Sequence, residues 1–169
     1  MMKPEERCLH HNLYGQALAF VVVREKDDRY LLTAATQINF GGPQAVIDDN
    51  QALSVANLNL DAGKKAMYMS DFFAAHSFFD HGISYLRLRR EHWNEHYDLS
   101  LELFNLAAKC AFMNAEHDSL KMLTDQIMHN AKCLEDKFQA ISITVSLMNF
   151  SGNVPAAVDL INNTLSSLD

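Results

Sequence analysis

The hydrophobic residues of this chain recur every three or four positions over most of its length, which is the spacing of amphipathic α-helices. The pattern predicts helices over Cys8–Glu25, Tyr30–Phe40 and Asp118–Lys132, among others. Phe20–Val23 is rich in β-branched residues and would fit a strand if taken alone. Helices are favoured overall because the chain has only 6 Gly and 3 Pro, too few turn residues for a β-sandwich.

The stretch Asn57–Leu88 is central to the predicted fold. It is predicted to form two helices joined by a tight turn near Ser70 and Asp71. Small residues on the touching faces would let the two backbones approach closely, and one phenylalanine would fill the space beside them. The residues expected to pack in this way are Gly63, Ala66, Ala75, Phe79 and Gly82. Such a hairpin is typical of proteins that stack helix pairs.

A weak internal repeat in the sequence supports the stacking of helix pairs. The positions Ala75, Phe79 and Gly82 can be matched to a second and a third set, offset by 45 and then 37 residues. The matched sets are Leu120, Thr124 and Ile127, and then Ala157, Ile161 and Thr164. These offsets fall in the size range of helix-pair repeats of the tetratricopeptide and HEAT type. A helical bundle without repeats is the alternative.

Turn signals divide the pattern. Gly41-Gly42-Pro43 is the strongest break, because proline lacks a backbone donor and restricts the residue before it. We therefore predict N-terminal helices and a Gly-Gly-Pro loop over 1–47, and a helical-repeat region over 48–169. Asp48 is expected to cap the next helix, and Gly152 to end a later helix in the left-handed conformation.

The last predicted helix carries the cleanest apolar stripe, which includes Val154, Val158, Ile161, Leu165 and Leu168. No polar helix follows to cover it, so we expect part of the stripe to be exposed. That exposure predicts either a continuation of the chain, which would make this sequence a fragment, or self-association through the C-terminal helix.

Charge and cysteine content narrow the function classes. The formal net charge is −7, which argues against nucleic acid as a partner. The longest apolar run, Ala17–Val23, is far too short to cross a membrane, and the first residues lack a secretory signal. Three cysteines without a paired framework indicate a cytoplasmic protein with reduced thiols. Cys110 lies on an apolar stripe and should be inert, whereas Cys133, near a turn, is the better candidate for modification.

Several segments together resemble one group of very large signalling ATPases. The segments are Leu58–Ala66 with the Ala75, Phe79 and Gly82 set, then Trp93, Tyr97-Asp98-Leu99 and Glu135-Asp136-Lys137. Proteins of that group combine a kinase-like region, an AAA-type or related ATPase module and a long helical solenoid. The resemblance implies a tetratricopeptide-like segment of the solenoid and brings no catalytic residue with it. The Gly63-Lys64 pair lacks the earlier glycine of a phosphate-binding loop, so we expect no cofactor.

One short motif invites a catalytic interpretation. His92-Trp93-Asn94-Glu95-His96 matches the HxxEH pattern of zinc proteases, in which two histidines bind zinc and the glutamate is the base. The segment lies at a polar junction between helices, however, so we expect Trp93 to pack there as an aromatic wedge and the histidines to be incidental. A histidine phosphotransfer bundle using exposed His129 is a further alternative.

The prediction is therefore an all-α, tetratricopeptide-like right-handed solenoid of antiparallel helix pairs with about eight helices. Its helix-packing positions are the five residues of the central hairpin together with Trp93, Ala108 and Ala157. We expect no enzyme activity and no metal. The expected role is a scaffold for protein or peptide partners, or for neighbouring domains of a larger chain, in ATPase-linked signal transduction.

Overall fold

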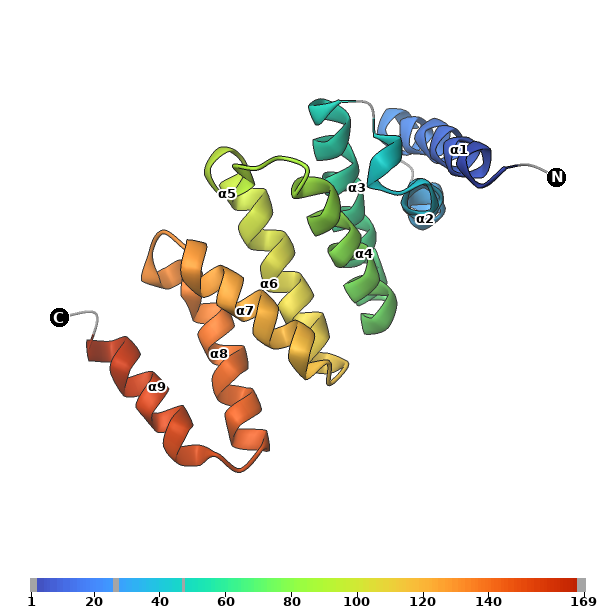
Figure 1. The fold of residues 1–169 in the computed structure, drawn as a ribbon. Coiled ribbons are helices and arrows are strands. Elements are labelled where there is room, and N and C mark those ends of the chain that lie inside the picture. Colours follow the sequence, from blue (N-terminus) through green and yellow to red (C-terminus); the bar gives the residue numbers. More distant parts are fainter. Residues whose placement is uncertain (1–2, 26–27, 47, 167–169) are drawn as a thin grey trace. The chain divides into compact units, whose positions relative to one another are not determined.

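The computed structural model describes residues 3–25, 28–46 and 48–166 (Figure 1). Across these residues the chain has no strand, which confirms the all-α prediction. Within the described ranges the nine α-helices are α1 (Pro4–Glu25), α2 (Leu31–Gly41), α3 (Asp49–Tyr68), α4 (Phe72–Leu86), α5 (His92–Glu95), α6 (Tyr97–Met113), α7 (His117–Asn130), α8 (Leu134–Phe150) and α9 (Val154–Ser166). Two short 3-10 helices, Asp28–Tyr30 and Pro43–Ala45, flank α2. The single-turn α5 falls in the predicted polar break, and the other eight helices match the number expected.

The helices form two compact units, Met1–Leu103 and Phe104–Asp169, here called unit 1 and unit 2. Unit 1 contains α1 to α5 and the beginning of α6, and unit 2 contains the rest of α6 with α7, α8 and α9. The predicted segment 1–47 lies wholly within unit 1 and corresponds to α1, α2 and the turns after them.

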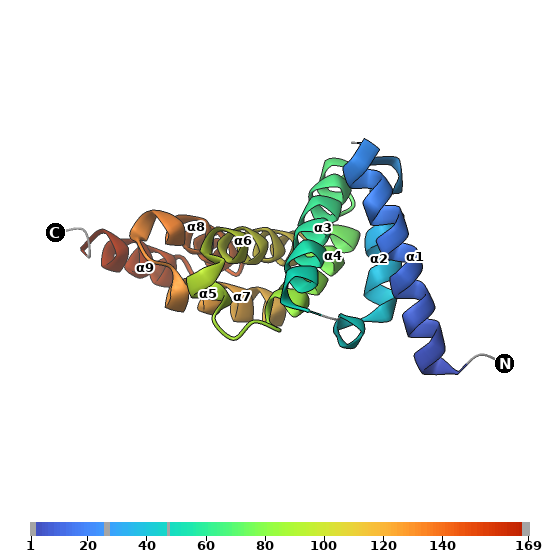
Figure 2. The same ribbon diagram turned by 90° about the horizontal axis from the view of Figure 1, so that it is seen from above.

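Unit 1 is built from two helix hairpins. Helix α1 packs along α2 and α3 packs along α4, while α2 also contacts α3 (Figure 2). The Asp48 side chain accepts a hydrogen bond from the Gln51 N–H at 2.8 Å, so the predicted cap of α3 is confirmed. The predicted strand-like run Phe20–Val23 is helical, because it lies within α1.

The α3–α4 hairpin is held by the small residues singled out above. A Cβ atom added to Gly63 would collide with the ring of Phe79, which is fully buried. Gly82 lies under the side chain of Leu103, where an added Cβ would be 2.9 Å from its Cδ2 atom. Ala66 and Ala75 are also buried. The absence of bulk at these positions therefore sets how closely the helices approach.

The α1–α2 hairpin also packs through glycines, Gly15 and Gly41, to which the sequence analysis gave no packing role. A Cβ on Gly15 would meet the Ile38 backbone nitrogen at 2.8 Å and the Ala34 carbonyl oxygen at 2.9 Å. A Cβ on Gly41 would lie 3.0 Å from the Cys8 carbonyl oxygen. Backbone atoms cannot move aside as side chains can, so an added methyl group would be harder to accommodate here than its distances alone indicate.

Two buried polar contacts join the hairpins of unit 1. Asn39 and Asn59 exchange amide hydrogen bonds of 2.7 and 3.1 Å between α2 and α3. The Tyr85 hydroxyl of α4 donates to the Ile38 carbonyl oxygen at 3.0 Å, and burial raises the pKa of Tyr85 to about 12. The Tyr85 hydroxyl and the Asn59 side-chain oxygen belong to buried residues and find partners in these contacts, so both contacts favour one relative placement of the hairpins.

Three helix pairs share one turn geometry. The residues Ser70, Ala115 and Gly152 each adopt a left-handed backbone, with φ of 62°, 59° and 75°. After each, the next N–H donates back to the third-last carbonyl of the helix, as in Asp71 to Ala66 at 3.0 Å and Glu116 to Ala111 at 2.9 Å. Asn153 donates in the same way to Met148 at 2.9 Å. This is the Schellman motif, and its offsets of 45 and 37 residues match those of the sequence repeat.

Unit 2 has its own apolar core, to which α6, α7, α8 and α9 all contribute. Its buried residues include Ala108, Leu120, Leu123, Ile127, Ala140, Ile141 and Ala157. In the second and third sets of the repeat, Leu120, Thr124 and Ile127 are buried, whereas Ile161 is exposed. Leu168, predicted to end the last stripe, and the side chain of Leu165 lie outside what the structure describes.

Replacing Gly63 by alanine should destabilise unit 1 by about 1–3 kcal/mol, because the new methyl group overlaps the buried Phe79 ring. The combination Gly63→Ala with Phe79→Leu should cost less than the sum of the two single changes, since leucine leaves room for the methyl group. Urea denaturation of the four proteins measures this. Strict additivity would contradict the contact.

Replacing Ala115 by glycine should stabilise the protein by about 0.5–1 kcal/mol, because glycine adopts positive φ without steric cost. The reverse change, Gly152→Ala, should destabilise by about 1 kcal/mol. Thermal denaturation followed by circular dichroism gives both values. As a matched control, Ala17→Gly within α1 should destabilise by about 1 kcal/mol, since there glycine weakens a helix.

Candidate functional site

The predicted polar break between α4 and α6 forms a compact junction in unit 1. Helix α4 ends at Leu86, and the Arg87 and Arg89 N–H groups donate to Ile83 and Leu86 carbonyls to close it. A turn then leads into the four-residue α5, whose C-cap is His96. The junction thus turns the chain from α4 into α6 within ten residues.

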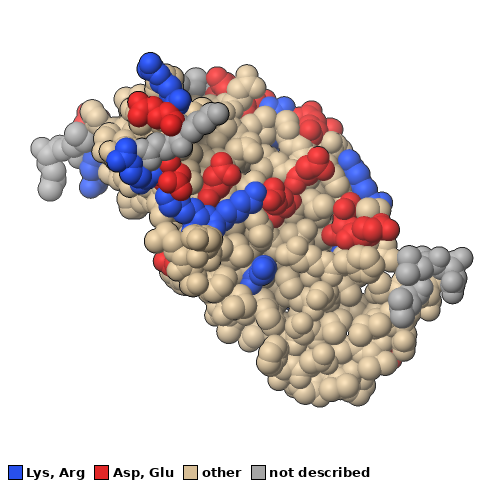
Figure 3. Space-filling view, turned by 180° about the vertical axis from the view of Figure 1, so that it is seen from behind, with Lys and Arg blue, Asp and Glu red and all other residues tan. Residues whose placement is uncertain are grey.

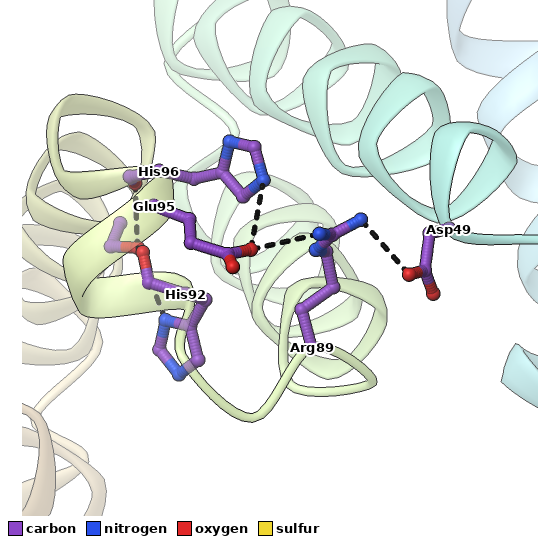
Figure 4. A network of polar contacts seen from close by, with 6 residues as sticks. Asp49, Arg89, His92, Glu95 and His96 are labelled. Carbon is purple, nitrogen blue, oxygen red and sulfur yellow. Dashed lines mark hydrogen bonds and ion pairs between the residues drawn. The ribbon is translucent and has the colours of Figure 1, made fainter.

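Arg89 ties this junction to the start of α3. Its guanidinium lies 2.8 Å from Glu95 Oε2 and 3.1 Å from Asp49 Oδ2 (Figure 4). The hydrogen bond from Arg89 lowers the pKa of Glu95, and the same bond raises the pKa of Arg89. The Glu95 carboxylate is therefore ionised and oriented by the arginine. Nothing in the sequence pattern separated Arg89 from its neighbours Arg87 and Arg90.

His92 is buried at the same junction. Its Nδ1 atom lies 3.1 Å from the Ser100 hydroxyl oxygen, and that hydroxyl lies 2.9 Å from the His92 carbonyl oxygen. Burial lowers the pKa of His92, and the nearby Arg87 and His96 lower it further. His92 is therefore a neutral, structural side chain near pH 7.

The HxxEH residues do not share one helical face. His92 is the first residue of α5, but His96 follows its end with φ of −131° and ψ of 48°. In Figure 4 the His96 ring lies beside Glu95, with Nε2 3.9 Å from Oε2, while the His92 ring extends from the other side of α5. Among the described residues, no group of three His, Cys, Asp or Glu side chains is placed to hold a metal ion. Glu95, which would be the base in the zinc-hydrolase alternative, is paired with Arg89.

Trp93 lies partly buried between two rings of the junction. Its ring centroid is 5.8 Å from that of His92 and 6.1 Å from that of Tyr97. This placement fits an aromatic side chain that fixes the chain reversal.

A concave surface lies in unit 2 between α7, α8 and α9, and we call it the α7–α8 groove. It encloses about 510 Å³ and is mostly apolar. Its lining comprises His117, Asp118, Leu120, Lys121, Thr124, Asp125 and Met128 of α7, Ile141, Thr144, Leu147 and Met148 of α8, and Leu160 of α9. The charged residues of this set all belong to α7, so the α7 side of the groove, here called its rim, is charged, while α8 and α9 contribute only uncharged side chains. The sequence analysis did not locate this groove, because it depends on how α7, α8 and α9 pack.

Other residues considered from the sequence lie apart from the groove and the junction. His76 of α4 is buried, with Nε2 3.7 Å from Asp80 Oδ1. His129 is exposed in the last turn of α7. Burial raises the pKa of the Cys110 thiol to about 11, which fits its expected inertness, and Cys133 is exposed. No helix within the described ranges is long and apolar enough to cross a bilayer.

Comparison with known proteins found no similar protein. No family model, curated protein or solved structure matches the chain. Functional inference therefore depends on the geometry described above.

The stability of unit 1 should fall as the pH drops below about 6.5, the ordinary pKa of histidine. The folded state holds His92 neutral, so the unfolded state binds more protons in this range, and the slope from this residue is at most about 1.4 kcal/mol per pH unit. Above this range His92 contributes no slope. Urea denaturation between pH 7.5 and 5.5 should show a flatter profile for His92→Gln.

The exposed His129 supplies a control for this measurement. His129→Gln, an exposed position in the last turn of α7, should leave the pH profile unchanged. Equal profiles for the wild type and His92→Gln would mean that His92 is not held neutral.

Proposed function

We propose that the chain is a non-catalytic scaffold that binds a segment of a partner protein in the α7–α8 groove. The observation that carries the proposal is the groove itself, an apolar concavity of about 510 Å³ with charged side chains along one rim only. Apolar grooves between helices accept amphipathic helices, whose apolar face replaces the water in the groove.

The composition of the groove favours an adaptable fit. Met128 and Met148 line it together with Leu147 and Leu160, and methionine side chains can change rotamer to suit different partners. On the rim, Asp118 and Asp125 outnumber Lys121. A partner helix with leucines on one face and a lysine or arginine at its edge has the complementary chemistry.

The wider architecture we propose is the tetratricopeptide-like right-handed solenoid of antiparallel helix pairs. The recurrence of one Schellman turn at Ser70, Ala115 and Gly152 supports repeated units. The resemblance to the solenoid of large signalling ATPases suggests the setting. In that setting the bound segment would belong to a neighbouring domain or to a protein partner in signal transduction.

The α7 helix offers a matched pair of methionines for testing the groove. Met128 lines the groove and is 38% exposed, whereas Met122 is outside it and 48% exposed. A phage-displayed library of amphipathic helical peptides would be selected on the wild-type protein, and the best peptide synthesised with a fluorescent label. We expect Met128→Glu to weaken its binding by about tenfold or more, and Met122→Glu to leave it unchanged.

Fluorescence anisotropy gives the dissociation constants. Both substitutions introduce the same charge on one helix at exposed positions, so an unspecific effect of charge would appear in both variants. Failure of the library to yield any binder, or an equal loss in the two variants, would contradict the proposal.

A further inference from the structure

Helix α1 carries an apolar stripe that the described residues of unit 1 leave largely exposed. Leu9, Leu13 and Phe20 fall on one face and are 54%, 57% and 64% exposed. The face of α1 that packs on α2 is a different one, formed around Asn12 and Gly15. The apolar face of α1 is therefore not the face that packs on α2.

Helix α9 repeats this arrangement in unit 2. Val154, Val158 and Ile161 form one stripe and are 54%, 48% and 41% exposed, while Ala157 is the residue buried against the rest of the unit. Residues 138–158 contain no Lys, Arg, Asp or Glu, and α9 carries only Asp159. On the face shown in Figure 3, the surface over α8 and α9 is accordingly almost free of charge.

The contacts within each unit show which kind of helix could pack on each of these stripes. Where consecutive helix pairs meet, the second helix of one pair contacts the first helix of the next. Helix α2 contacts α3, the Leu103 side chain of α6 covers Gly82 of α4, and α7 contacts α8. Helix α9 is the second helix of its pair and α1 is the first of its own.

We propose that α9 of one copy of the chain packs on α1 of a second copy, head to tail. Such a contact repeats the contact between consecutive pairs and covers both apolar stripes at once. The charge distribution is compatible with this partner. Copies that each carry a net charge of −7 repel one another, and residues 138–158, which contain no charged side chain, are where they can approach at least electrostatic cost. The proposal is independent of the α7–α8 groove.

The contact is tested with one charged substitution on each stripe. Leu13→Glu alters α1 alone and Val158→Glu alters α9 alone; both side chains are about half exposed, so the fold should tolerate the charge. Sedimentation velocity of the wild type between about 10 and 500 µM should show association that increases with concentration. Each variant alone should be monomeric. An equimolar mixture of the two should form dimers and nothing larger, because it has one intact α9 stripe and one intact α1 stripe.

The mixture separates head-to-tail packing from the symmetric alternative. If α9 packed on α9, Leu13→Glu would still dimerise by itself, which would overturn the proposal, as would a wild type that stays monomeric throughout. His10→Glu and Asn163→Glu, exposed and off the stripes, should associate like the wild type. Salt should not weaken the association, since screening reduces the repulsion between the copies. Weakening by salt would indicate an ionic contact and would contradict the proposal.

Discussion

Close approach of helix backbones at small residues is the constraint on which the rest of unit 1 depends. Gly63 leaves the space that the Phe79 ring occupies, and Gly15 meets backbone atoms of α2 directly. Because the helices lie so near one another, the reciprocal Asn39–Asn59 amide pair and the Tyr85–Ile38 hydrogen bond come within reach. Helices that pack through small residues tolerate little change, because adding or removing a single methyl group creates a clash or a void. The polar pairs then select one register among those that packing alone would allow.

The function we propose follows from the surfaces that this packing leaves. Buried small residues let the helices of a pair approach closely, and in unit 2 the surfaces of α7, α8 and α9 line a mostly apolar groove. At the α4–α6 junction the polar side chains are engaged in holding the chain reversal, with Arg89 joined to Asp49 and Glu95, and His92 to Ser100. These contacts explain the histidines and the glutamate of the junction as structural residues. A protein that binds a partner through the shape of its surface needs no chemically reactive side chain.

Much of the fold could be predicted from the sequence because helical periodicity and turn chemistry are local. The hairpin at Asn57–Leu88, the Asp48 cap and the left-handed Gly152 all follow from residues within a few positions of one another. Gly15 and Gly41 were missed, although glycine inside a helix is costly and its presence signals a close contact. The groove and the direction of the α1 stripe could not be found, because periodicity identifies an apolar face without saying what covers it. The left-handed Ala115 was also beyond prediction, since alanine carries no signal for that conformation.

The short turns that close the helix pairs also bear on how the chain reaches its structure. Each turn places two helices side by side that are neighbours in the sequence, so the entropy lost in closing each loop is small. Proteins dominated by such local contacts cross their folding barrier quickly, and a hairpin can form before the next one is complete. A chain emerging gradually from the ribosome could therefore assemble pair by pair, with little time spent in states that expose all of its apolar residues at once.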